Sequence, residues 1–208
     1  MNVIRASILK LADSEINFNT DGIHDIMSII KKYLYLELDN KNIKKAVSMW
    51  RTNKNEALKI YGHISFWDTS KITNMEALFF NNKSFNDDIS KWNTSQVTNM
   101  KSMFAHAESF NQEIENWYVS KVKKMNSMFT FTNCFDKCIN DWNISNVTKM
   151  DGMFYAVFAF DKPLNKWKIN KYADMLNMFS MAKNFKQSID EWEIMETQRA
   201  SLNLKKRI

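Results

Sequence analysis

Six tryptophans at one constant interval constrain this sequence more than any other feature. They stand at positions 67, 92, 117, 142, 167 and 192, each 25 residues after the one before. A fixed period of about 20 to 50 residues is typical of repeat proteins, in which each unit buries its apolar face only by packing on its neighbours. The sequence therefore predicts five full coils, 67–91, 92–116, 117–141, 142–166 and 167–191, with Trp192 opening a sixth.

Seven positions of each coil carry a large apolar residue. With the tryptophan as position 1, the others are positions 6, 9, 12, 13, 19 and 23, and Tyr172 is the one departure at position 6. The third coil shows the pattern as Trp117, Val122, Met125, Met128, Phe129, Phe135 and Ile139. Each such side chain contributes about 1.5–3 kcal/mol when fully buried. We expect like residues to stack on like residues in one shared interior.

The spacing within a coil predicts its local structure. Met75, Leu78 and Phe79 have the three- and four-residue spacing of a short helical turn. Phe110 and Ile114 are four residues apart, so both share one face of an extended strand. The predicted fold class is an α/β repeat solenoid that is leucine-rich-repeat-like, with one short parallel strand and one short helical turn per 25-residue coil and a helical N-terminal cap.

Residues 1–66 lack the 25-residue pattern and are predicted to be helical. One helix is expected from Asp21, because apolar residues between 23 and 34 recur at helical spacing. Asp39 or Asn40 is predicted to cap a second helix, and Asn53 or Asn55 to open a third that Gly62 closes. The second helix is expected to bury Ile43, Ala46, Val47 and Trp50.

Three segments follow from this reading. Residues 1–66 form an N-terminal cap over the first coil or, alternatively, a separate small helical module. Residues 67–192 form the five repeats and the start of a sixth, and residues 193–208 form a C-terminal cap or tail. An exposed end of a repeat array needs a cover, which favours the cap.

Charge and composition narrow the function classes. The net charge of +6 is dispersed, with 10 basic and 7 acidic residues in 1–66, 15 and 14 in 67–191, and 4 and 2 in 192–208. Nucleic-acid binders usually gather basic residues on one face, so nucleic acid is a disfavoured partner. The chain has no apolar run of about 18 residues and no leader pattern, which predicts no membrane span and favours an intracellular location. Cys134 and Cys138 are expected to be reduced thiols, and the protein a monomer.

The sequence carries no pattern that predicts catalysis. His24, His63 and His106 lie in different segments, and His106 is expected to be an exposed bystander. Phosphate-binding loops, nucleophile elbows and paired metal-binding histidines are missing from the sequence. The acidic residues of the coils are too sparse for calcium-binding repeats, and the methionine ladders have core spacing. We therefore predict no enzyme activity, no cofactor and no metal site.

The repeat pattern resembles that of a known family. The stretch from Trp92 to Asn111 fits, almost position for position, the 25-residue repeat of the BspA-like leucine-rich repeat family of surface proteins, a repeat familiar from mycoplasma lipoproteins. The segment from Tyr61 to Ser65 also resembles the usual start of such arrays. The resemblance covers about residues 61–192 and implies a leucine-rich-repeat-like solenoid, a role in adhesion or protein interaction, and association with a surface.

We predict a non-catalytic module for protein–protein interaction or adhesion, with a protein partner of unknown identity. The variable residues at positions 21 and 22 are predicted to form the binding face on the expected strands. Candidate binding residues are Asp87, Asp88, Gln112, Glu113, Lys137, Lys162 and Gln187. Two alternatives remain, namely binding of nucleic acid or an anionic surface through dispersed lysines, and an enzyme with an unrecognised activity in the N-terminal region.

Overall fold

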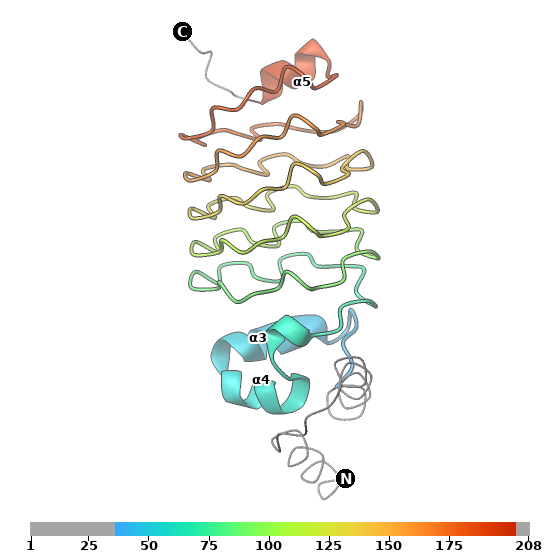
Figure 1. Cartoon of the computed structure of the whole chain (residues 1–208), viewed down its shortest axis with the longest axis vertical. Coiled ribbons are helices and arrows are strands. Elements are labelled where there is room, and N and C mark those ends of the chain that lie inside the picture. The colour runs from blue at the N-terminus through green and yellow to red at the C-terminus, as the bar shows by residue number, and fades with distance from the viewer. Residues whose placement is uncertain (1–35, 203–208) are drawn as a thin grey trace, which may run out of the picture.

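A stack of coils lies between helices at its two ends (Figure 1). The structure is a computed structural model, and it describes residues 36–202. Along the chain, α3 (Ile43–Thr52), α4 (Lys54–Tyr61) and the 3-10 helix η1 (Ile64–Phe66) precede the coils. The short helix α5 (Glu196–Ser201) follows them.

The two helices before the coils agree with the sequence prediction in most details. α3 buries Ile43, Ala46, Val47 and Trp50, as expected, although its N-cap is Asn42. Asn53 caps α4 by accepting the Glu56 N–H, and Gly62 ends it with a φ of 73°. Glycine adopts this left-handed backbone without a Cβ clash. The helix expected from Asp21 lies outside the described residues.

α3 and the first coil are joined by aromatic and polar contacts. The Trp50 ring lies 5.9 Å from the Trp67 ring, edge to face, and its indole N–H donates to Asp87 at 2.9 Å. The Asn40 side chain accepts the backbone N–H of Thr73 at 3.0 Å. These contacts cover the first coil on the side where it has no neighbouring coil. The boundaries of the predicted cap, 1–66, stay a prediction because residues 1–35 are not described.

The predicted apolar ladders form the core. Residues at the seven positions are buried in all five coils, except Tyr172, which is 74% exposed. Rings at position 13 stack along the whole array, as in Phe104 on Phe129 at 5.7 Å. They also stack on the rings at position 19 of the same coil, as in Phe104 on Phe110 at 3.9 Å. The core is therefore one continuous pile of rings, with a nearly constant step.

The fifth coil departs from the others by one residue at a corner. In earlier coils the N–H of position 6 donates to the carbonyl of position 3, as from Val147 to Ile144. In the fifth coil Ala173 donates to Asn170 instead, and Ala173 is buried while Tyr172 points to solvent. The one-residue shift ends before Met175, which is buried at position 9 like the methionines of the other coils. This corner therefore tolerates a local shift in register.

The tryptophans bond successive coils through their indole nitrogens. Trp117 donates its indole N–H to the carbonyl of Ile89 at 3.2 Å, and Trp142 donates to Ile114 at 3.1 Å. The Ile114 carbonyl also accepts the backbone N–H of Trp117. Each of these carbonyls thus accepts two hydrogen bonds, one from the backbone N–H of the tryptophan three residues later and one from the indole N–H of the tryptophan 28 residues later. Burying an indole N–H requires such a partner.

The predicted strand and helical turn of each coil were wrong. The coils of residues 67–192 contain no strand and no helix, only isolated parallel bridges at position 8, such as that between Asn99 and Lys124. The fold is therefore a stack of irregular coils and neither an α/β solenoid nor a leucine-rich-repeat-like one. The side chains expected to point inward do so, but the backbone that carries them consists of turns.

Left-handed residues explain why positions 9 to 15 form neither helix nor strand. Positions 11 and 15 have positive φ in every coil, as in Ser127 at 55° and Phe131 at 56°. Only alternate amides reach the next coil, and Ser127 and Phe129 donate to Asp151 and Met153 at 2.9 and 3.0 Å. In a helix these amides would form hydrogen bonds within the segment. In an interior strand successive amides would bond alternately to the two neighbouring strands.

Side-chain oxygens replace the strand ladder at positions 19 to 23. The Asn86 amide oxygen accepts the backbone N–H of Asn111 at 2.9 Å, and Asn111 in turn accepts that of Asp136 at 3.0 Å. The series continues as the Asp136 carboxylate accepts the N–H of Asp161, and the Asp161 carboxylate accepts that of Lys186. Because these backbone donors bond to side chains, this part of the coil forms no strand, although Phe and Ile both point inward as predicted.

α5 occupies the place of a sixth coil. The Asn177 N–H donates to the Ser201 carbonyl at 2.8 Å, which is the same 24-residue step that links the interior coils. The buried Gln198 side chain donates to the Ala173 carbonyl at 3.0 Å, and Leu202 is fully buried. The segment predicted as a C-terminal cap or tail therefore contacts the last coil through α5, and residues 203–208 lie outside the described part.

Exchanging glycine and serine at position 11 should change stability in opposite directions. Replacing Ser127 by glycine relieves a left-handed residue and is expected to raise the free energy of unfolding by up to about 1 kcal/mol. Replacing Gly152, with a φ of 61°, by serine should lower it by a similar amount. A Cβ at Gly152 would meet nothing closer than 3.6 Å, so the backbone alone sets this loss. Urea unfolding measures both, and equal signs would contradict the backbone assignment.

Candidate functional site

The residues predicted to bind a partner form a row along the coils, but most are engaged with a neighbouring coil. Gln112 donates to the carbonyl of Asn86 at 2.8 Å, and Gln187 does the same to Asp161 at 3.0 Å. Lys137 pairs with Glu113 at 2.6 Å, and Lys162 with Asp136 at 2.8 Å. These side chains reinforce the stack. Their role as partner contacts stays a prediction, without the strand on which it was placed.

The two acidic candidates of the first coil have different surroundings. Asp87 accepts the indole N–H of Trp50 and pairs with Lys54 at 2.9 Å, so it holds α3 and α4 to the coil. Asp88 is exposed and accepts the N–H of Ser90 at 2.9 Å. Hydrogen bonds from Ser90 lower the pKa of Asp88, which keeps its carboxylate ionised. Both carboxylates therefore have partners within the described residues.

Charges elsewhere on the coils are also held by their neighbours. The hydrogen bond to Asp136 raises the pKa of Lys162. Burial raises the pKa of Asp151, and the nearby carboxylate of Asp174 adds to this increase. For Glu76, burial raises the pKa, but hydrogen bonds from Asn99 and Lys101 outweigh it and lower the pKa overall. These shifts arise from burial and from neighbouring groups within the coils.

Removing the Asp136 carboxylate should weaken the stack. Alanine at this position leaves the half-buried N–H of Asp161 without its acceptor, so we expect a loss of about 1–3 kcal/mol in the free energy of unfolding. Asparagine keeps that acceptor and loses only the exposed pair with Lys162, which contributes about 0–1 kcal/mol. Urea unfolding of the two variants checks the ladder, and equal losses would contradict it.

An exposed row of large side chains runs along the coils at positions 14 and 15. We call it the outer ridge, and it consists of Phe80, His106, Phe131, Tyr155 and Met181. Ring centroids are 5.9 Å apart from Phe80 to His106, 4.8 Å from His106 to Phe131, and 5.5 Å from Phe131 to Tyr155. The Tyr155 hydroxyl donates to the Met181 sulfur at 3.1 Å. The ridge therefore connects all five coils.

Three ridge residues have a backbone conformation that disfavours large side chains. His106, Phe131 and Met181 have φ values of 60°, 56° and 60°. A bulky residue in the left-handed region is an outlier that costs free energy. These side chains are outside the core, since Met181 is 51% exposed and His106 and Phe131 are half-buried. Position 15 has this conformation in every coil, including Asn81 and Ala156, so the turn of the coil imposes it on whichever residue stands there.

The sequence did not predict the ridge, because no single position of the repeat carries its large residue in all five coils. The large residue stands at position 14 in Phe80 and Tyr155, and at position 15 in His106, Phe131 and Met181. The usable signal was that every coil has one large residue at one of these two positions. His106, predicted to be an exposed bystander, is half-buried and stacks on Phe131.

One face of the His106 ring and one face of the Phe131 ring cover each other in the ridge. His106 and Phe131 are stacked with 18° between their planes, and the ring pairs on either side are edge to face. Stacking of nucleobases on aromatic side chains needs a free ring face. Ring edges instead favour contact with apolar side chains and with the negative faces or oxygens of other groups.

The described residues contain no cluster of side chains suited to metal binding or redox chemistry. No group of three or more His, Cys, Asp or Glu side chains within residues 36–202 could hold a metal ion. Cys134 and Cys138 are both free thiols. No helix in this part of the chain has the length and apolarity needed to cross a membrane.

Nine of the twenty lysines in residues 36–202 form ion pairs. Lysine supplies the cation in nine of the ten ion pairs of the described residues. Most of these pairs join carboxylates on a neighbouring coil, as in Lys149 with Asp174 at 3.1 Å and Lys166 with Asp141 at 2.7 Å. The positive charge is thus neutralised in part by neighbouring carboxylates, whereas a nucleic-acid interface usually gathers basic residues on one face.

The fold defines a repeat protein made of stacked coils, with a ridge of exposed side chains along it. Two overlapping segments, 47–137 and 115–206, match the family described as Mycoplasma protein of unknown function, DUF285. The chain belongs to this family. Searches of curated proteins and of solved structures found no match.

Proposed function

We propose that this protein is a non-catalytic protein-interaction module and that the outer ridge is its contact surface. The observation that carries the proposal is the unbroken row of exposed and half-buried side chains from Phe80 to Met181, part of which has left-handed backbone. Aromatic residues are enriched at the energetic centres of protein interfaces. The resemblance to BspA-like surface proteins is part of this proposal and is consistent with adhesion.

Rigidity supports the same function. Each ridge residue projects from a turn whose amides are bonded to the next coil, as Phe131 is to Tyr155 at 3.0 Å. Ordering side chains on binding costs about 0.5–1.5 kcal/mol each, and residues already fixed in the free protein avoid part of that cost. A stiff row of rings suits an apolar groove or a row of apolar side chains on a partner protein.

Capture of partners by a ridge variant tests the proposal. The immobilised chain is compared with a variant in which Phe131 and Tyr155 are both serine. A matched control replaces Tyr118 and Tyr172, which are 72% and 74% exposed and lie off the ridge. Loss of two interface aromatics is expected to reduce capture of a specific partner by at least about tenfold, whereas the control retains it.

Unchanged capture by a folded ridge variant would contradict the proposal. Thermal melting of both variants verifies the fold. The nucleic-acid alternative predicts binding that weakens steeply with salt, whereas ridge-mediated capture should respond weakly to salt because the ridge contains no Asp, Glu, Lys or Arg side chain.

A further inference from the structure

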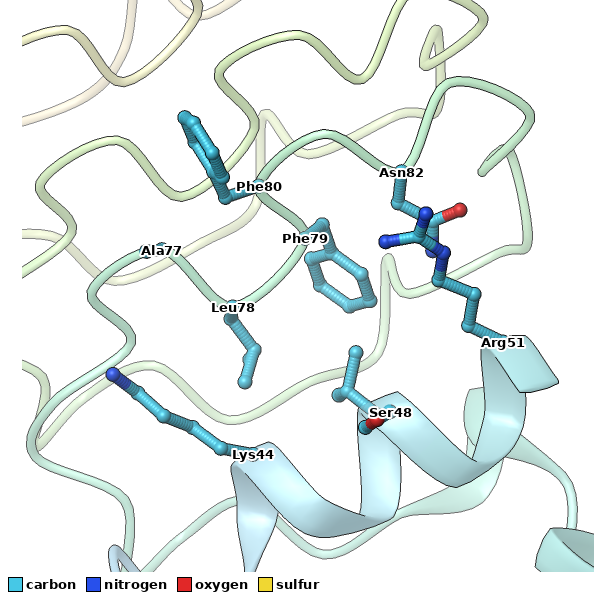
Figure 2. A pocket seen from close by; sticks show the side chains of 9 residues that line it. Lys44, Ser48, Arg51, Ala77, Leu78, Phe79, Phe80 and Asn82 are labelled. Carbon is cyan, nitrogen blue, oxygen red and sulfur yellow. The ribbon is translucent and has the colours of Figure 1, made fainter.

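A pocket of about 200 Å³ lies where the outer ridge meets α3. Figure 2 shows α3 side chains on one side and residues 77–82 of the first coil on the other. Phe80, the first residue of the ridge, lines it. Sites that enclose whole small molecules measure roughly 300–1,000 Å³. The volume therefore suits a single side chain of a partner better than a cofactor.

Asn82 contributes its side-chain amide to the lining of this pocket. The residue is only 7% exposed, and its side chain has no hydrogen-bond partner among residues 36–202. Figure 2 shows this amide directed toward the pocket, on the same side as the Arg51 guanidinium. The Asn82 amide is not among the fully buried unpartnered atoms of the described residues, so it is open to the pocket and available to donate to a ligand that supplies an acceptor.

Comparison between coils shows that Asn82 is exceptional. The equivalent residues at position 16 are Ala107, Thr132, Val157 and Ala182. The Thr132 hydroxyl is satisfied by the carbonyl of Phe104, one coil earlier, at 2.7 Å. Asn82 has no earlier coil beneath it, and α3 supplies no acceptor. The polar residue therefore stands at the one position 16 that faces a pocket.

Two cations flank the same pocket. Lys44 and Arg51 project from α3 one on each side, and neither forms an ion pair or a side-chain hydrogen bond within residues 36–202. Seven of the fifteen lysines of the coils form ion pairs, so Lys44 and Arg51 differ from the other unpaired cations by lining the pocket. Between them, Val47, Leu78 and Phe79 form an apolar floor. Guanidinium and amide N–H groups bind carboxylates through charge-assisted hydrogen bonds.

We propose that this pocket binds an aspartate or glutamate side chain of the partner protein. The carboxylate accepts hydrogen bonds from Asn82 and Arg51 with Lys44 nearby, and the side-chain methylenes lie on the apolar floor. The inference rests on the proposed function, since Phe80 makes the pocket continuous with the ridge. The partner is thereby specified as a segment with an acidic residue at the point where its apolar contacts with the ridge begin.

Selection from a displayed random-peptide library on the intact chain tests this chemistry. Peptides that bind the natural protein are expected to be enriched in Asp or Glu. The enrichment should disappear when Lys44 and Arg51 are both replaced by glutamine. It should persist when Lys41 and Lys45, exposed residues in the same segment that do not line the pocket, are replaced in the same way. Equal loss in both double variants, or no acidic enrichment, would overturn the proposal.

Asn82→Ala separates binding from structure, because alanine already stands at this position as Ala107 and Ala182. For a selected acidic peptide, fluorescence anisotropy should show binding weakened by about tenfold or more, as for loss of a charge-assisted bond. The melting temperature should stay level, since the side-chain amide makes no hydrogen bond within residues 36–202 and is open to the pocket. Unweakened binding, or a fall in melting temperature that indicates a structural role, would overturn the assignment of Asn82.

The same selection distinguishes this inference from the proposed function. If replacing Phe131 and Tyr155 abolishes peptide binding while the Lys44 and Arg51 variant still selects acidic peptides, the ridge is supported and the pocket chemistry is rejected. If the ridge variant selects the same acidic peptides as the natural protein, the ridge is rejected and the pocket stands alone.

Discussion

Replacement of Phe129 by alanine is expected to lower the free energy of unfolding by about 3–5 kcal/mol. The ring is fully buried in the middle coil and stacks on Phe135 at 4.2 Å. It also stacks on Phe104 and Phe154, in the coils on either side, at 5.7 Å each. Removing it opens a cavity at two coil interfaces at once, and the ring pile cannot close without moving its neighbours.

A matched control for Phe129 is Phe131, only two residues away. Phe131 belongs to the outer ridge and is half-buried, so its replacement by alanine should cost no more than about 1.5 kcal/mol, the value of its ring contacts. Urea unfolding followed by tryptophan fluorescence measures both variants. Similar losses from the two changes would show that the ring ladders are not the main source of stability.

Insertion of one alanine between Thr130 and Phe131 is expected to have a still larger effect. In this segment alternate amides reach the next coil, and Phe129 and Phe131 donate to Met153 and Tyr155. One additional residue moves Phe131 and the following core residues out of register with both neighbouring coils. We expect a loss above about 5 kcal/mol, more than any single core truncation, together with a broad, uncooperative transition.

The control insertion lies in the same coil, between Ser120 and Lys121. Both residues are exposed, and the equivalent corner of the fifth coil already slips by one residue, with Ala173 in place of Tyr172 at the buried site. The corner can absorb the additional residue, so the expected cost is about 1–2 kcal/mol. Thermal melting of the two insertions separates these outcomes, and a parent-like transition after insertion at 130 would contradict the register argument.

Sequence alone predicted which side chains would be buried. The ladders of Trp, Met and Phe repeat without interruption, and a residue type that recurs at a fixed step leaves little choice of facing direction. α3 and α4 were predictable for a similar reason, because Asn53 and Gly62 are good helix boundaries and Ile43, Val47 and Trp50 lie on one helical face.

The backbone of the coils could not be predicted in the same way. Phe110 and Ile114 have the same inward direction in a strand and in the observed irregular segment, so spacing did not distinguish the two. Asn86, Asn111 and Asp136 look like ordinary surface residues in sequence, although their oxygens accept backbone N–H groups of the next coil. The predicted strands were wrong because side chains perform this part of the bonding.

Left-handed residues were hidden for a related reason. Positive φ is usually read from glycine or asparagine, but these coils place Ala77, Ser102 and Phe131 there. The ridge and the pocket depend on these turns and on the packing of α3 against the first coil. Asn82 looks like an ordinary loop residue in sequence, and only the structure shows that it lines the pocket between α3 and the first coil.

Native-state hydrogen exchange of the middle coil tests the central claim, that coils are joined through alternate amides of turns. The N–H groups of Met125 and Ser127 donate to the fourth coil, whereas that of Asn126 between them has no partner among residues 36–202. We predict slow exchange at 125 and 127, at the rate of global unfolding, and fast exchange at 126. Uniform protection of all three, as in a helix or an interior strand, would contradict the account.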